Sequence, residues 1–281
     1  MDPDKVLEKT AIEVRMKLLQ NIVMAGGGHT GGSLSSVDIL VALYFHVMNI
    51  DPENPDLEDM DRFIMSKGHS VESFHAVLSK RGFFSQEILG TYGRFNSILA
   101  GHPTRKVPGV ELNSGALGHG LSVGTGMAIA AKRDGSKSRI FVLMGDGEQG
   151  EGSVLEAASA AGHYHLDNLV GIVDRNYLQI SGYTEEVMAI ENLEGKYRAC
   201  GWAIGECDGH NMKQLTETLG NTPFEPGKPS LVIARTIKGK GVSFMENQAA
   251  WHHKVPSAEQ LEKALEELDL KRINYDGGHT L

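Results

Sequence analysis

The chain has 281 residues, of which 41% are hydrophobic and 22% are charged, and its formal net charge is −9. This composition is ordinary for a globular protein, and the length suits one large α/β domain or two small ones. Lys and Arg form no cluster that would favour nucleic acid or a membrane surface, and no apolar run reaches the length of a membrane span. We therefore expect neither nucleic-acid nor membrane partners.

The two cysteines, Cys200 and Cys207, form no C-x-x-C pair and no repeated spacing. The N-terminal stretch alternates charged and apolar residues, which is unlike a secretory signal peptide. Reduced thiols without a leader sequence are typical of cytoplasmic proteins, so we expect that location.

Apolar periodicity, interrupted by glycine and proline, predicts alternating helices and strands along the chain. Ser33 is predicted to cap the second helix, and Ser257 the last one. Segments 183–194 and 246–256 are predicted to be loops, and 274–281 a disordered polar tail. The predicted helices cover residues 4–24, 33–44, 70–80, 115–133, 154–165, 212–219 and 258–268. The predicted strands cover residues 62–65, 141–144, 169–173, 202–206 and 230–236.

This order of elements predicts an α/β fold, with a doubly wound, mostly parallel sheet flanked by helices. We expect one domain over residues 1–270, followed by a C-terminal tail over residues 271–281. Glycine is abundant, at 34 residues, which fits tight turns between strands and helices.

The stretch 142–178 is the most informative part of the chain. An apolar strand runs into the turn Gly145-Asp146-Gly147-Glu148-Gln149-Gly150, a helix follows, and a second apolar strand ends at Asp174. This β-α-β order with a G-x-G-x-x-G turn fits dinucleotide binding, in which Asp174 would bind a ribose. A nicotinamide-dependent oxidoreductase is therefore one interpretation, although this short pattern has low specificity.

The chemistry of the turn favours a different ligand. Asp146 lies where a diphosphate would approach, and a bare carboxylate repels a diphosphate unless a cation lies between them. Asn176 follows the next strand, and the carboxyl ends of parallel strands meet at one edge of a sheet. Carboxylate, amide and carbonyl oxygens are ligands that Mg²⁺ prefers. The sequence predicts a cation-bridged diphosphate here, and ordinary turn chemistry is the alternative explanation for both residues.

Gly-Asp-Gly followed by Asn, 30 residues after the Asp, resembles the thiamine-diphosphate motif, and the further pair Glu151-Gly152 is similar to its transketolase form. The resemblance implies thiamine diphosphate as the cofactor and Mg²⁺ as the metal, with Ca²⁺ as an alternative. It implies metal ligation by Asp146, Asn176 and the carbonyl of Leu178. It also places Gly147 and Asn176 against the cofactor.

Histidines in glycine- or proline-marked loops match the same family pattern, whereas Arg175 and His253 match no position in it. The resemblance implies that His29, His102, His252 and Glu151 are catalytic, with Glu151 a buried acid in a proton relay between the two active sites of a dimer. Favourable charge at a helix N-terminus is the alternative explanation for Glu151. The implied cofactor contacts are Lys67, His69, Gly115, Ala116, Leu117, Lys238 and His252.

The resemblance extends over about residues 4–268, yet it covers only the diphosphate-binding half of a transketolase. It implies the N-terminal subunit of a split transketolase, inactive alone, that works with a separate C-terminal chain carrying the pyrimidine-binding domain, two copies of each. The expected reaction transfers a two-carbon ketol unit from a ketose phosphate to an aldose phosphate. The particular sugars stay open, including a sulfonated or branched ketose, because the groups that bind the acceptor lie largely in the other half.

Other interpretations remain at this point. The alpha subunit of a 2-oxo-acid dehydrogenase shares the cofactor motif, but the histidines and Glu151-Gly152 favour transketolase. A deoxyxylulose-phosphate synthase fits less well, since it normally comes as one long chain. A nicotinamide oxidoreductase and a non-catalytic subunit that retains the motif are the alternatives from other functional classes.

Overall fold

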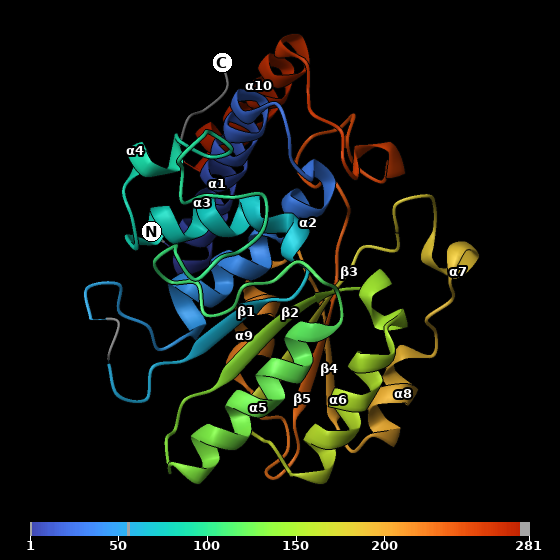
Figure 1. Cartoon of the computed structure of the whole chain (residues 1–281). Coiled ribbons are helices and arrows are strands. Elements are labelled where there is room, and N and C mark those ends of the chain that lie inside the picture. The colour runs from blue at the N-terminus through green and yellow to red at the C-terminus, as the bar shows by residue number, and fades with distance from the viewer. Residues whose placement is uncertain (1, 55–56, 276–281) are drawn as a thin grey trace.

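The computed structural model describes residues 2–54 and 57–275 and contains a five-stranded parallel sheet in the order β1-β2-β3-β5-β4 (Figure 1). The strands are β1 (Arg62–Met65), β2 (Ile140–Gly145), β3 (Leu169–Arg175), β4 (Ala203–Asp208) and β5 (Ser230–Arg235). All five predicted strands are confirmed, with ends that shift by one or two residues. The predicted α/β class, with a parallel sheet and flanking helices, is confirmed as well.

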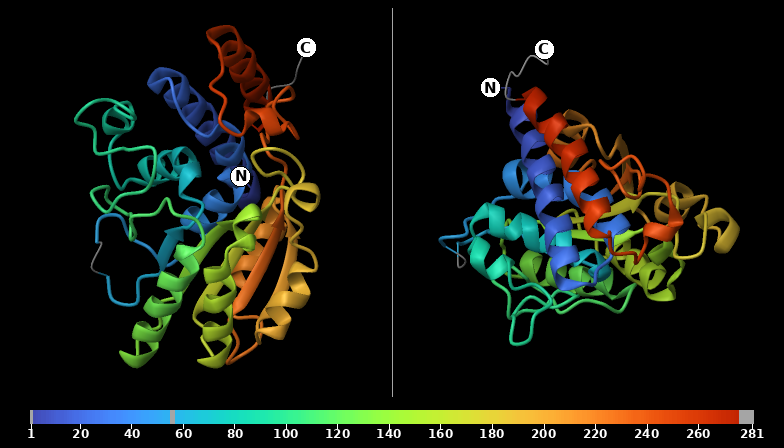
Figure 2. Two further views of the ribbon diagram at one scale, coloured as in Figure 1. Left: turned by 45° about the vertical axis from the view of Figure 1, so that its right-hand side comes forward. Right: turned by 90° about the horizontal axis from the view of Figure 1, so that it is seen from above.

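Helices cover both faces of the sheet, and two hydrophobic clusters lie between them and the strands. The helices of the first cluster are α1 (Pro3–Ala25), α2 (Thr30–Ala42), α3 (Val71–Arg81), α9 (Met212–Gly220) and α10 (Ala258–Tyr275). The helices of the second cluster are α5 (His119–Arg133), α6 (Gly152–His163) and α8 (Leu193–Ala199). Helices α1 and α10 lie side by side on the outside of the first layer (Figure 2).

The short elements lie between these helices and strands. They are η1 (Leu43–Val47), η2 (Gly68–Ser70), α4 (Gln86–Leu89), η3 (Gly147–Gly150), α7 (Thr184–Val187) and η4 (Ala249–Trp251). None of the helices in the described part of the chain is long and apolar enough to cross a membrane.

The apolar run of β2 explains why this strand is central. Phe141 and Leu143 point into the first cluster, and Val142 and Met144 into the second. Successive side chains of a strand point to opposite faces, so a strand covered on both faces has a continuous apolar sequence. All four side chains are buried, which places the following turn, at Gly145, at the edge of a rigid core.

Two helix starts differ from the prediction. Helix α2 begins at Thr30 with His29 as its N-cap, so the prediction of a cap at Ser33 is wrong. Ser33 lies inside the helix, where its hydroxyl donates to Glu72 at 2.7 Å. The glycine-rich helix begins at His119 and not at residue 115, because Gly118 takes a left-handed conformation (φ 82°) at the N-cap.

The C-terminal third holds a further correction. The predicted loop 183–194 contains α7 and the first residues of α8, and α8 begins at the Asn192 cap, which accepts from the Gly195 N–H. The Ser257 cap is confirmed, since its hydroxyl accepts from the Gln260 N–H at 3.2 Å. Helix α10 continues to Tyr275, so the segment 274–281, predicted to be disordered, is helical over residues 274 and 275. The predicted C-terminal tail 271–281 is likewise helical over residues 271–275, and residues 276–281 lie outside the described part. The domain boundaries stay a prediction.

A close contact between α6 and the turn after α8 gives a test of the packing. A Cβ on Gly162 would lie 1.7 Å from the Cys200 carbonyl oxygen, whereas one on Gly126 of α5 would meet nothing within 4 Å. Gly162→Ala should lower the free energy of unfolding by about 1–3 kcal/mol through overpacking. Gly126→Ala should raise it by up to about 1 kcal/mol through helix propensity. Urea denaturation of both variants measures these changes in the free energy of unfolding. Equal changes in the two variants would contradict the packing described.

Burial of His75 predicts a loss of stability in acid. Burial lowers the pKa of His75 from 6.5 to about 3, and neither ring nitrogen has a partner among the described residues. The unfolded chain therefore takes up this proton first as the pH falls below about 6.5. His75→Phe should reduce the loss of unfolding free energy between about pH 7 and about pH 5 by roughly 1–2 kcal/mol. Denaturation at several pH values measures this, and an unchanged slope would contradict the buried neutral state.

Candidate functional site at the carboxyl edge of the sheet

The ends of four strands bring the predicted polar residues to one edge of the sheet. Lys67 follows β1, Asp146 follows β2, Asn176 follows β3 and Lys238 follows β5. The strands are parallel and in register, with Gly145 opposite Asp174, so these residues emerge at the same level. This is the edge at which open α/β sheets bind ligands.

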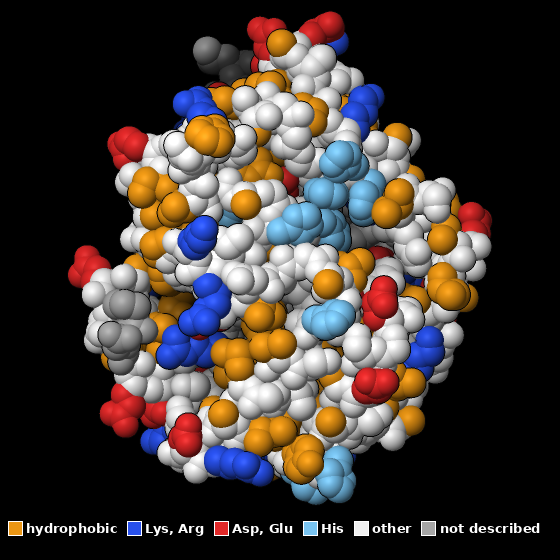
Figure 3. All heavy atoms as spheres, in the orientation of Figure 1, with side chains coloured by type: hydrophobic (Ala, Val, Ile, Leu, Met, Phe, Trp, Pro, Cys, Tyr) orange, Lys and Arg blue, Asp and Glu red, His pale blue; other side chains and the backbone are white. Residues whose placement is uncertain are grey.

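A cavity of about 490 Å³ lies at this edge, where Figure 3 shows histidines gathered around a hollow in the surface. The predicted site residues that line the cavity are His29, Lys67, His69, Gly115, Leu117, Asp146, Gly147, Glu151, Asn176, Leu178, Lys238 and His252. Two predicted residues lie outside the lining. His102 has its ring 6.3 Å from that of His29, and Ala116 is exposed between Gly115 and Leu117.

The three predicted metal ligands lie on two neighbouring turns. The Asp146 carboxylate is buried and accepts from the N–H groups of Gly147, at 2.7 Å, and Tyr177, at 2.6 Å. The Asn176 side-chain oxygen accepts from the Leu178 N–H at 3.2 Å. Burial, and then the charge of Asp174 nearby, raise the pKa of Asp146. A buried carboxylate in this state is stabilised by a cation.

The donor set fits a hard cation that shares its ligands with a phosphate. In the described part of the chain, no group of three or more His, Cys, Asp or Glu side chains is placed to hold a metal. One carboxylate, one amide oxygen and one carbonyl are instead the few ligands that Mg²⁺ takes from a protein when phosphate supplies others. The Leu178 carbonyl already accepts from the Lys238 ammonium at 2.9 Å, so it faces a positive charge.

The two lysines of the site differ in their partners. The Lys67 ammonium is buried, pairs with the Asp174 carboxylate and donates to the Gly32 carbonyl at 3.0 Å. The Lys238 ammonium contacts the Leu178 carbonyl and lies 3.0 Å from the His252 ring. Burial and the charge of Lys67 lower the pKa of Lys238 to about 8.

Five histidine rings surround the entrance of the cavity. The His29 ring lies between the others, with centroid distances of 5.3 Å to His69, 5.7 Å to His252 and 4.6 Å to His253. His102 completes the group, and its ring packs against the backbone of Gly115, where a Cβ would come within 3.1 Å.

Three of these imidazoles are neutral at neutral pH. Burial, together with the nearby lysine and histidine charges, lowers the pKa of His29 to about 4, of His69 to about 2 and of His252 to about 3. A neutral imidazole has one N–H donor and one acceptor nitrogen, so it can bind hydroxyl groups in either direction.

Glu151 and Gly147 occupy the rim of the cavity. Glu151 is the N-cap residue of α6 and is exposed in this chain, so the structure gives no support for the predicted burial of this acid. Its role in a proton relay stays a prediction, because the partner of that relay would belong to another copy. A Cβ on Gly147 would lie 3.1 Å from the Gln179 side chain, so the glycine leaves room for Gln179 beside the cavity.

Several residues of the site carry no signal in the sequence. Glu72 is buried and accepts from the His29 N–H at 3.1 Å and from the Tyr92 hydroxyl at 2.7 Å. Glu148 is buried within the glycine turn and accepts from the N–H of Gly118 at 2.8 Å. Arg175 joins the site through Asp146 and His253 through His29, contacts that no local pattern shows.

The nicotinamide interpretation fails on Asp174. A ribose-binding acid must offer its carboxylate to the ligand, but Asp174 is fully buried and bonds to Lys67, Ser35 and Thr236. Asp146 also fills the position that a dinucleotide diphosphate would approach.

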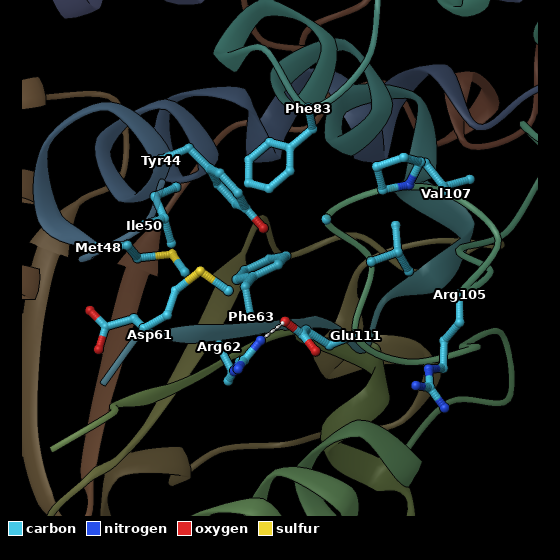
Figure 4. A pocket seen from close by; sticks show the side chains of 14 residues that line it. Tyr44, Met48, Ile50, Asp61, Arg62, Phe63, Phe83, Arg105, Val107 and Glu111 are labelled. Carbon is cyan, nitrogen blue, oxygen red and sulfur yellow. Dashed lines mark hydrogen bonds and ion pairs between the residues drawn. The ribbon is translucent and has the colours of Figure 1, made fainter. Parts of the chain in front are cut away.

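A second cavity, of about 240 Å³, lies away from this edge, beside β1 (Figure 4). Aromatic rings of Tyr44, Phe63 and Phe83 line it, and the charged pair Arg62–Glu111 closes one side at 2.9 Å. Glu111 pairs with Arg62 and Asp61 pairs with Arg139, so both carboxylates of this cavity already have a cationic partner.

Comparisons with known proteins agree with this site. The family described as "Transketolase, thiamine diphosphate binding domain" matches residues 7–273. One of the subunits of the apulose-4-phosphate transketolase from Phocaeicola vulgatus is 51% identical over 264 residues, 94% of each chain. The 6-deoxy-6-sulfo-D-fructose transketolase subunit SqwG of Clostridium sp. is 40% identical over 264 residues, 94% of this chain and 96% of that one.

Solved structures give the same result. A transketolase from Pichia stipitis has a TM-score of 0.87 and 26% sequence identity over 97% of this chain and 44% of that one. This chain thus spans less than half the length of that transketolase. These matches do not favour the nicotinamide oxidoreductase or the 2-oxo-acid dehydrogenase. The chain belongs to the transketolase family and comprises its thiamine diphosphate-binding domain.

Proposed function

We propose that this chain is the N-terminal subunit of a two-chain transketolase, with a separate C-terminal chain that carries the pyrimidine-binding domain, two copies of each. The complex transfers a two-carbon ketol unit from a ketose phosphate to an aldose phosphate. The observation that carries the proposal is the meeting of Asp146, Asn176 and the Leu178 carbonyl at one edge of a sheet of this family. A cytoplasmic location belongs to the proposal, supported by the two free cysteines.

The residues of the edge hold the cofactor by its diphosphate. Asp146, Asn176 and the Leu178 carbonyl would hold Mg²⁺, or Ca²⁺ in its place, and the metal would offset the charge of the diphosphate. Gly147 lets the phosphate approach the turn, and the Lys238 ammonium faces the same space. Thiamine diphosphate, when bound, supplies the carbon nucleophile of the reaction.

The histidines act on the sugar. His29, His102 and His252 lie around the entrance, where their ring nitrogens can form hydrogen bonds with hydroxyl groups. They also move protons to and from those hydroxyls near neutral pH. His69, Gly115, Lys67 and Leu117 line the cavity and would contact the cofactor, and Ala116, which lies outside the lining, would join them.

A second chain is needed because the described residues form a single sheet with its helices. A pyrimidine-binding domain from the second chain would close the open side of the cavity over the cofactor. Two relatives matched over nearly their whole length are named as separate subunits, which supports a two-chain arrangement.

The substrate we propose is a specialised ketose phosphate. The relative at 51% identity is named for apulose 4-phosphate and the relative at 40% identity for a sulfonated fructose, so the first supports a branched, phosphorylated ketose more strongly. Side-by-side rates with apulose 4-phosphate, 6-deoxy-6-sulfofructose and an unbranched ketose phosphate distinguish these donors.

Replacement of the metal-binding carboxylate tests the site. Asp146→Asn should weaken Mg²⁺-dependent thiamine diphosphate binding by about 100-fold or more, because the cation loses its charged ligand. Isothermal titration of the two-chain complex measures this. Asp134→Asn, at the exposed C-terminus of α5, is the control and should leave binding unchanged. Equal binding by Asp146→Asn and the control would refute the site.

Reconstitution tests the two-chain proposal. The chain alone should show no ketol transfer, and addition of a partner chain that carries the pyrimidine-binding domain should restore the reaction. Ketol transfer by the purified chain alone would contradict the proposal. Cofactor binding by the complex without turnover on any of the three donors would support a non-catalytic role.

A further inference from the structure

We propose that Arg175 is a positioning residue, which holds the turn 145–150 and the loop 176–192 in the arrangement that the cation and the diphosphate require. The proposal deepens the proposed function and rests on it. It concerns a residue that makes no contact with substrate and acts through Asp146 and the Leu178 carbonyl.

The guanidinium of Arg175 joins the two segments directly. It lies at the end of β3, is fully buried, and donates to Asp146 at 3.3 Å and to the Thr184 hydroxyl at 2.7 Å. Its second nitrogen donates to Glu185 and Glu191, each at 3.0 Å. One side chain therefore ties the proposed metal-binding carboxylate to the first two residues of α7 and to Glu191, which lies beyond the end of that helix.

The backbone between the ligands is strained, and Arg175 lies against it. Tyr177 has a positive φ of 66°, which is rare for a large side chain and is stabilised only by its surroundings. Its N–H donates to Asp146, and its ring lies 4.1 Å from the Arg175 guanidinium carbon. The turn at Tyr177 brings Asn176 and Leu178 to the same cavity, so contacts that hold Tyr177 also set the spacing of these two ligands.

The loop that follows forms one wall of the cavity. Leu178, Gln179, Ile180 and Ser181 line it, and Ile180 is largely exposed. Backbone bonds close the loop on itself, from the Gln179 N–H to the Gly182 carbonyl and from the Thr184 N–H to the Tyr177 carbonyl. Thr184, Glu185 and Glu191 all accept from Arg175, so these bonds connect the loop to the end of β3.

Only an arginine fits this position. Its planar fork reaches four partners in different directions and stacks on the Tyr177 ring, which a lysine ammonium cannot do. The Arg175 Nε has no hydrogen-bond partner among the described residues. Burying this charge therefore has a cost, which the four bonds must offset.

The contacts leave part of Asp146 free for a cation. One carboxylate oxygen accepts from Gly147, and the other accepts from Tyr177 and Arg175. A carboxylate has about four acceptor sites, so one remains for the cation. The three donors fix the direction of that site.

Arg175→Gln should weaken Mg²⁺-dependent thiamine diphosphate binding by the two-chain complex about 10–100-fold, the usual effect of removing a partner behind a metal ligand. Arg175→Lys should weaken this binding less than Arg175→Gln does. Saturating Mg²⁺ and cofactor should return kcat of Arg175→Gln close to the wild-type value while the cofactor KM stays raised. A purely structural role would lower kcat instead. In the chain alone, amides of 176–192 should exchange hydrogen faster in Arg175→Gln.

Two further variants keep the test decisive. Arg198→Gln removes an exposed ion pair with Glu194 in α8 and is the matched control, which should change neither binding nor exchange in the loop. Glu185→Gln combined with Glu191→Gln leaves the buried arginine in place and should weaken cofactor binding roughly 2–5-fold.

The outcomes separate the two proposals. If the wild-type complex binds no thiamine diphosphate with Mg²⁺, the proposed function fails. If wild type binds and Arg175→Gln binds equally well, the positioning role of Arg175 is overturned, whatever the exchange data show.

Discussion

The ion pair between Lys67 and Asp174 is the interaction on which the functional edge of the sheet depends. Both side chains are buried, and burying two charges costs several kcal/mol unless they are paired and hydrogen-bonded. Asp174 meets this condition by also accepting from Ser35 and Thr236. The four residues come from α2 and from the ends of β1, β3 and β5, so the pair fixes these elements relative to one another.

The Lys67–Asp174 pair also constrains the position of the glycine-rich turn, residues 145–150. Strand β2 lies between β1 and β3, so the glycine-rich turn at its end emerges beside the pair. Glu148 folds back over that turn and accepts from Gly145 and from Gly118, the residue before α5. The turn is thus bonded to its neighbours on each side, and Asp146 is presented to the cavity with little freedom.

The sequence allowed the strands, and the positions of Asp146 and Asn176 at their ends, to be predicted because both depend on local patterns. Apolar runs showed the strands, and Asp146 and Asn176 follow them directly. The partners of Lys67 and Arg175 could not be predicted in this way, since Asp174 lies 107 residues after Lys67. The cap at Ser33 was wrong for the same reason, because Glu72 offers a tertiary partner that local helix-capping preference does not include.

The distribution of charge at this edge of the sheet supports the proposed binding of a metal ion. Lys67 is neutralised by Asp174, and Arg175 by Asp146 together with the two glutamates of the loop. His29, His69 and His252 at the entrance are neutral at neutral pH, and burial lowers the pKa of Lys238 to about 8. Among the described residues that line the cavity, Lys238 is thus the lysine without a carboxylate partner. One ammonium cannot balance a diphosphate next to Asp146, which supports the proposal that a divalent cation would lie between that carboxylate and the diphosphate.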